Sequence, residues 1–179
     1  DTLNAQVDEI IEDEEDAGIR QKTKSQWTAL TRLVGAKPRL EQVAADLVNH
    51  FEKRTETAEG KGMIVCMSRD ICVELYDAIV ALRPEWHDPE YDQNPEYALD
   101  QPPNPDRGTI RIVMTGSAAD PERLQRHLYN HDAKKRLEKR FKDPSDPLKL
   151  VIVRDMWLTG FDAPCCHTMY VDKPMKGHN

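Results

Sequence analysis

Three short segments of this chain combine hydroxyl, glycine and charged residues in a pattern suited to binding an anion. They are Ser68-Arg69, Thr115-Gly116-Ser117 and Thr159-Gly160. Glycine lacks a Cβ and permits positive φ, so peptide N–H groups can turn towards phosphate oxygens. Serine and threonine add hydroxyl donors, and arginine adds a charged fork that binds two oxygens at once. The chemistry that these segments predict is the binding of phosphate groups.

Asp162 follows the third segment, and its carboxylate does not suit an anionic ligand. A carboxylate repels phosphate, so Asp162 is better suited to accept a hydrogen bond from a ribose hydroxyl or an arginine. Each segment also has a simpler interpretation, because a Thr-Gly turn often only caps the next element. Trp157 leaves two interpretations open in the same way, contact with a ligand or packing against a helix.

Short apolar runs directly before the three segments predict buried strands at residues 63–67, 109–114 and 148–153, and a fourth strand is predicted at 168–171. Helical patterns lie between the first three strands, one opening at Asp70 with an inward face that includes Leu82, the other running from Asp120 to about Lys142. Alternating strands and helices predict an α/β fold with a mainly parallel sheet. Ligands bind such sheets at the carboxyl ends of the strands, so the three segments are expected to converge there.

The region before the first strand is predicted to be helical. Ser25 can cap a helix with Trp27, Leu30, Leu33 and Val34 on one face, and Pro38 suits the first turn of a second helix. We therefore expect residues 25–58 to form a helical segment that packs on residues 59–179. Residues 1–24 are expected to be an acidic, flexible segment, because residues 1–16 carry eight acids and no base.

The net charge of −7 comes from that acidic segment, so it does not exclude a polyanionic partner. Residues 121–142 hold eight Lys and Arg against three acids. A helix with this excess of positive charge could follow a nucleic-acid backbone. Alternatively, its lysines and arginines could form an ordinary solvated face.

Several classes of site are disfavoured by the sequence. It has no G-x-x-x-x-G-K-[ST] phosphate loop, nucleophile elbow or H-E-x-x-H motif, so no catalytic residue is predicted. His127 and His131 have the spacing of zinc ligands on a helix, but without the glutamate they are expected to be surface residues, and no metal site is predicted. The four cysteines lack C-x-x-C spacing and are expected to be reduced thiols. Residues 84–107 hold half of the twelve prolines and predict a long surface excursion.

Three longer stretches resemble a known family. "KGMIVCMSRDICVELYDAIVALRPEW", "IRIVMTGSAADP" and "LKLVIVRDMWLTGFDAPCCHTMYVDKPMKGHN" resemble the second RecA-like motor domain of the type I restriction endonuclease R (motor) subunit, a superfamily 2 helicase-like DNA translocase. The resemblance implies a RecA-like three-layer fold, incomplete at the C-terminus. Residues 59–179 would be this domain, ending before motif VI and its arginine finger.

The resemblance also implies roles for individual residues. Ser68 and Arg69 would lie in the motif IV loop, and residues 115–117 (Thr115, Gly116, Ser117) in the next DNA-facing loop. In motif V, Thr159 and Gly160 would touch DNA phosphate and help couple it to the nucleotide, and Gly160 and Asp162 would lie at the bound nucleotide.

The parent protein implied by the resemblance is an ATP-dependent type I site-specific deoxyribonuclease of the prokaryotic cytoplasm. Its expected partners are double-stranded DNA and the methylation and specificity subunits, with no membrane. ATP and Mg²⁺ would bind mainly through a first motor domain that this chain lacks, so the chain alone is expected to be inactive and to hold no cofactor. The alternatives are a non-catalytic nucleic-acid-binding or interaction module with a helicase-like fold, and another superfamily 2 helicase that acts on RNA.

Overall fold

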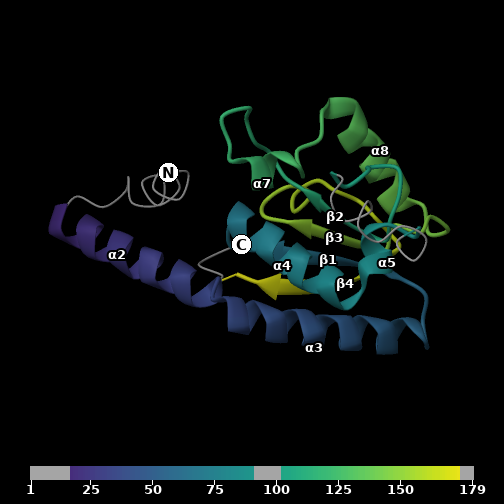
Figure 1. Cartoon of the computed structure of the whole chain (residues 1–179), viewed down its shortest axis with the longest axis horizontal. Coiled ribbons are helices and arrows are strands. Elements are labelled where there is room, and N and C mark those ends of the chain that lie inside the picture. Colours follow the sequence, from purple (N-terminus) through teal and green to yellow (C-terminus); the bar gives the residue numbers. More distant parts are fainter. Residues whose placement is uncertain (1–16, 91–101, 174–179) are drawn as a thin grey trace.

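A computed structural model describes residues 17–90 and 102–173, and shows two long helices followed by an α/β unit (Figure 1). The elements in chain order are α2 (Ala17–Val34), α3 (Lys37–Thr55), β1 (Lys61–Cys66), α4 (Arg69–Leu82), α5 (Pro84–His87), β2 (Ile110–Val113), α7 (Glu122–Gln125), α8 (His131–Lys142), β3 (Leu150–Val153) and β4 (Cys166–Asp172). Residues 1–16 of the predicted acidic segment and residues 91–101 of the predicted excursion lie outside the described part.

The four strands form one parallel sheet in the order β2-β3-β1-β4. Val65 of β1 pairs with Val153 of β3, which in turn pairs with Val113 of β2. The carboxyl ends of these three strands therefore lie level at one edge of the sheet, which we call the carboxyl edge. The predicted α/β fold with a parallel sheet is confirmed, and its arrangement is RecA-like.

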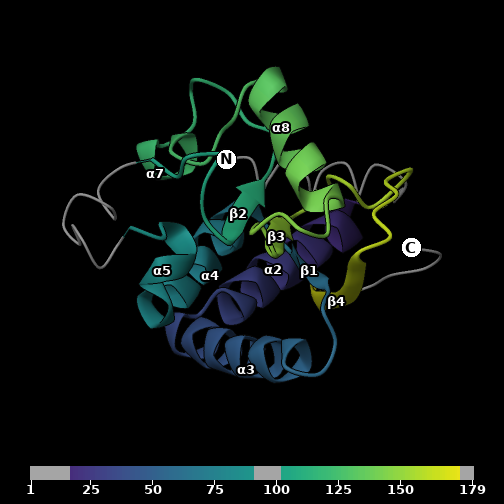
Figure 2. The ribbon, with the colours of Figure 1, turned by 90° about the vertical axis from the view of Figure 1, so that its right-hand side faces the viewer.

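The order of the strands explains which element covers which face. The chain crosses from β1 to β2 in one direction, and from β2 to β3 and β3 to β4 in the other. Because crossovers between parallel strands are right-handed, reversing the direction moves the connection to the opposite face. Helix α4 accordingly lies on one face, with α3 packed beside it, and α8 lies on the other (Figure 2). The connection 154–165 shares the face of α8.

The core is divided by the sheet into two clusters, because alternate residues of a strand point to opposite faces. The first cluster joins α3 and α4 to Ile64, Ile112 and Ile152. The second joins Leu137 and Phe141 of α8 to the strand residues Met63, Val65, Val113, Val151 and Val153. Strands β1, β2 and β3 are buried on both faces, which accounts for their continuous apolar runs.

The two leading helices confirm one prediction and correct others. Pro38 lies in the first turn of α3, whose residues Leu40, Ala44, Leu47, Val48 and Phe51 are buried. The predicted helix start at Ser25 is wrong, because α2 already begins at Ala17 and Ser25 lies inside it. Leu33, predicted to lie on the apolar face of its helix, is 68% exposed, and Leu82, predicted to face inwards, is 42% exposed.

The single helix predicted between Asp120 and Lys142 is two helices, α7 and α8. Asn130 interrupts it, because its side chain accepts a hydrogen bond from the Ala133 N–H and so starts a new helix. His127 and His131 therefore do not share a helix face. His127, predicted at the surface, is buried beside Tyr76. Burial and the nearby Arg126 lower the pKa of His127 to about 3, so the ring is neutral.

Candidate nucleic-acid interface

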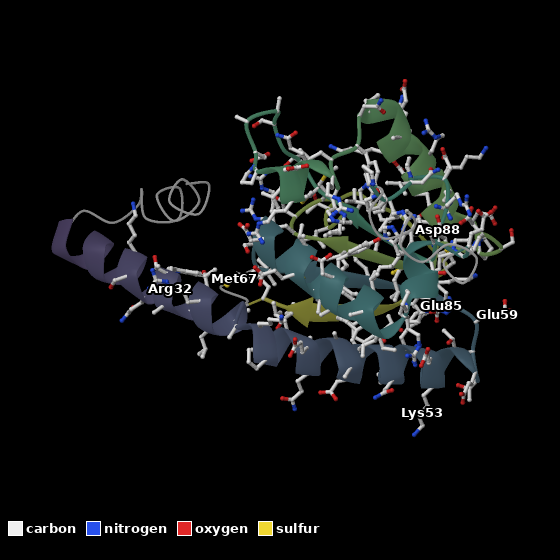
Figure 3. The ribbon with its side chains drawn as sticks, in the orientation of Figure 1. Arg32, Lys53, Glu59, Met67, Glu85 and Asp88 are labelled. Carbon is white, nitrogen blue, oxygen red and sulfur yellow. The ribbon has the colours of Figure 1, made fainter. Side chains whose placement is uncertain are left out.

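The three predicted segments follow the carboxyl ends of β1, β2 and β3, so the sheet brings them to one edge. Helix α2 passes this edge, where the Thr31 hydroxyl lies 3.8 Å from the sulfur of Met67. Figure 3 shows Met67 and Arg32 together on this side of the molecule, with Glu59 and Glu85 on the opposite side.

Ser68 serves the fold rather than a ligand. Its side-chain oxygen accepts a hydrogen bond of 3.2 Å from the Ile71 N–H, which caps helix α4. The residue is buried. The hydroxyl that the sequence offered as a DNA contact is therefore turned towards the first turn of α4.

Arg69 ties the loop after β1 to the loop after β2. Its two terminal nitrogens donate to the two carboxylate oxygens of Asp120 at 2.7 and 2.9 Å. One of them also donates to the Thr115 carbonyl at 3.1 Å. Arg69 is 8% exposed. Its bidentate fork, which the sequence assigned to phosphate, is engaged with a carboxylate of the same chain.

Asp120 completes this arrangement from the other side. It accepts a hydrogen bond of 2.7 Å from the Ser117 N–H. The Arg69 side chain first, and then the Ser117 N–H, lower the pKa of Asp120 to about 2. A Cβ on Gly116 would lie 2.7 Å from an oxygen of Asp120, so glycine permits this close fold. We call the Arg69–Asp120 pair and its bonds to residues 115–117 the edge latch.

The edge latch leaves the loop that it holds accessible. Thr115, Gly116 and Ser117 are all exposed. Sequence reasoning missed Asp120, which it assigned only to the start of a helix. The available signal was a carboxylate three residues after Ser117, but nothing local indicates that its partner is Arg69.

The loop after β3 presents a second accessible segment. Residues 158–160, which we call the loop tip, are exposed, and Asp162 is exposed beyond it. Gly160 has φ of +67°, and a Cβ there would meet nothing within 4 Å. Among the described residues, the side chains of Thr159 and Asp162 make no hydrogen bond or ion pair. Trp157 packs within the protein, stacked on Phe161 with ring centres 4.6 Å apart.

The basic segment 121–142 is mostly engaged inside the chain. Arg140, 10% exposed, binds Asp146 at 2.9 Å and the carbonyls of residues 105, 107 and 108. The remaining ion pairs join Arg136 to Asp106, Lys142 to Glu138, and Arg123 to Asp70 and Glu74. Within the described part of the chain, Lys134, Lys135 and Lys139 make no ion pair. The segment is therefore largely a structural helix surface with three available lysines.

The chemistry available at the carboxyl edge is hydrogen-bond donation to an anion by hydroxyls and peptide N–H groups, with one exposed carboxylate beside it. Across residues 17–90 and 102–173, no cluster of His, Cys, Asp and Glu is placed to hold a metal ion. The helices of these same ranges are too short or too polar to cross a bilayer.

Comparison with known proteins identifies relatives over the whole chain. Residues 114–179 match the family described as type I restriction enzyme subunit R domain 3. The chain is 51% identical over 179 residues to the type I restriction enzyme HindI endonuclease subunit of Haemophilus influenzae. It is 36% identical over 179 residues to the putative type I restriction enzyme MjaIXP endonuclease subunit of Methanocaldococcus jannaschii. All or nearly all of the chain is matched (100% and 99%), but it spans only 15% of the length of each relative.

Proposed function

Because the chain belongs to the family of type I restriction enzyme endonuclease (R) subunits, we propose that it is part of the motor of such a subunit. In this proposal it contributes the second RecA-like motor domain, which moves double-stranded DNA at the expense of ATP and leads to cleavage. The observation that carries the proposal is the carboxyl edge, where two exposed loops with hydroxyls and glycines lie side by side in the sheet order. The names of the relatives favour this function over an RNA helicase or an interaction module without catalysis.

The DNA backbone is the ligand of the two loops. The Thr159 hydroxyl and the Gly160 N–H donate to phosphate oxygens, and the absence of a Cβ at Gly160 lets the phosphate come close. The hydroxyls of Thr115 and Ser117 and the Gly116 N–H supply a second set of donors, whereas the Ser117 N–H is bonded to Asp120. Contacts of this kind position the protein on DNA without reading its sequence, as a translocating motor requires.

The edge latch gives Ser68 and Arg69 a different place in this proposal from the one the sequence predicted. Ser68 fixes the start of α4, and Arg69 fixes the shape of the loop 115–117. Arg69 acts on DNA through that loop and Ser68 supports α4, so neither side chain is a phosphate contact.

Bound Mg²⁺ neutralises charge on the phosphates of ATP during hydrolysis. Asp162 offers one exposed carboxylate, which suits a ribose hydroxyl or an arginine better than a complete metal site. Gly160 places a peptide group next to it. We expect Mg²⁺ and most of the ATP contacts on the other motor domain, so the chain alone should not hydrolyse ATP. The methylation and specificity subunits and a prokaryotic cytoplasm belong to the same proposal.

The test uses the intact R subunit assembled with its partner subunits. Thr159→Ala removes one hydroxyl donor and is expected to reduce translocation, measured by triplex displacement, more than DNA-stimulated ATP hydrolysis. Asp162→Asn keeps the size and removes the charge, and is expected to reduce ATP hydrolysis more severely. Methylation needs no motor and serves as the internal control. Normal translocation by both variants in a folded subunit would show that the loop after β3 has only a structural role.

A further inference from the structure

The loop after β3 contains an aromatic stack directly around its exposed tip. The rings of Trp157 and Phe161 are 4.6 Å apart and inclined by 3°. The three residues between them, Leu158, Thr159 and Gly160, are exposed. Because the two rings are in contact, the chain between them must reverse direction within three residues.

The backbone of this loop is strained at one end. Trp157 has φ of +64°, the only non-glycine residue with positive φ among those described. A bulky side chain is disfavoured in this left-handed region, so it persists only where the surroundings hold it. Gly160 has φ of +67° at the other end of the tip, where glycine meets no such penalty. The stacking partner of Trp157 is the contact that can hold the strained residue in place.

Phe161 connects this stack to the rest of the domain. Its ring centre lies 6.2 Å from that of Phe141, a fully buried residue of α8. Lys142, the last residue of α8, places its ammonium 4.8 Å from the Phe161 ring centre. Trp157 reaches Phe141 as well, at 5.9 Å. The stack is thus anchored on α8 rather than suspended in the loop.

We infer that Trp157 and Phe161 are positioning residues that hold the tip 158–160 in the shape in which it binds phosphate. The inference rests on the proposed function, because it concerns the same loop and DNA as its ligand. Each ring packs against the other and against Phe141, so we assign them to the shape of the tip and not to direct contact with DNA. Their role is to order the tip before DNA arrives, which lowers the entropy lost on binding.

The test compares two aromatic residues in the intact, assembled R subunit. Phe161→Leu removes the stack and keeps an apolar side chain. Trp86→Leu is the matched control, because Trp86 is also half-buried and packs against one aromatic ring, Phe51, at 6.1 Å, but lies in α5. Phe161→Tyr restores an aromatic ring. Three quantities are measured: the melting temperature, the DNA concentration that half-maximally stimulates ATP hydrolysis, and the rate of chymotryptic cleavage after Leu158.

Phe161→Leu is expected to raise that DNA concentration by roughly fivefold, the scale set by one aromatic pair. It should also accelerate cleavage after Leu158, while Phe161→Tyr restores both values. Trp86→Leu should lower the melting temperature without changing either value. If Phe161→Leu behaves like Trp86→Leu while Thr159→Ala still weakens DNA stimulation, the positioning role is overturned and the proposed function stands. If cleavage accelerates but neither Phe161→Leu nor Thr159→Ala alters DNA stimulation, the stack does hold the tip, and DNA binding there is overturned instead.

Discussion

Two Thr-Gly loops lie at the same edge of the sheet and are held in opposite ways. The loop 115–117 is fixed by the edge latch, in which a nearly buried ion pair binds two of its backbone groups. The loop tip 158–160 has exposed residues and is fixed only at its base, by stacked rings. The edge latch binds backbone groups of the loop itself, whereas the stack holds the tip only through the two residues that flank it. We therefore expect changes in the edge latch to lower stability, and changes in the loop tip to leave stability nearly unchanged.

Removing the edge latch is expected to give the largest effect on stability. Arg69→Ala leaves Asp120 without its charged partner and the Thr115 carbonyl without its donor. We expect the melting temperature to fall by about 5–10 °C, because losing one partner of a buried ion pair is strongly destabilising. Arg123→Ala is the matched control, since Arg123 also binds carboxylates, those of Asp70 and Glu74, but is half exposed. It should change the melting temperature by less than about 2 °C. Equal effects of the two variants would show that no latch exists.

The glycines of the two loops should respond differently to replacement by alanine. Gly116→Ala places a methyl group 2.7 Å from the Asp120 oxygen that binds Arg69 and Ser117, and 2.6 Å from Leu128. It should displace the latch and lower the melting temperature by about 3–6 °C. Gly160→Ala meets open space and carries only the cost of a left-handed alanine, about 1 kcal/mol. Thermal unfolding of both variants measures the difference, and a larger loss at Gly160 would contradict it.

The edge latch also predicts a pH dependence. The pKa of Asp120 is about 2 in the folded protein, against an ordinary value of 3.8 for the unfolded chain. Between these two values the folded protein keeps the carboxylate charged, whereas the unfolded chain takes up a proton. The latch therefore stabilises fully above pH 3.8, and its contribution is lost as pH falls from 3.8 towards 2. Asp120→Asn removes this contribution, so its stability deficit against the native protein should shrink over that window. Urea unfolding at pH 5 and pH 2.5 tests this, and an unchanged deficit would refute it.

The loop tip should show the smallest effect on stability. The Thr159 side chain is exposed and, among the described residues, bonded to none, so Thr159→Ala should change the unfolding free energy by less than about 0.5 kcal/mol. Denaturant unfolding beside the translocation assay separates this from its functional effect. A large loss of stability would mean that Thr159 supports the fold and is not held ready for a ligand.

The arrangement of the edge was predictable because its signals are local. Apolar runs ending at Met67, Met114 and Val153 indicated buried parallel strands, and parallel strands place their carboxyl ends together. The contacts that hold each loop were not predictable. Asp120 lies 51 residues from Arg69, and no local pattern joins them. The strain at Trp157 depends on stacking in the folded state, and propensity alone gives no reason for a tryptophan at positive φ.

In the proposed function, the exposed loops at the carboxyl edge contact DNA. The most direct measurement places a photo-crosslinking amino acid at residue 159, in the loop tip, or at Glu85, which is exposed on the opposite side of the molecule (Figure 3). Each variant of the intact R subunit is assembled with its partner subunits and irradiated on duplex DNA. We predict crosslinks from residue 159 at low salt that decline as salt rises, and none from residue 85. Equal crosslinking from both positions, or none from residue 159, would contradict the assignment of this edge to DNA.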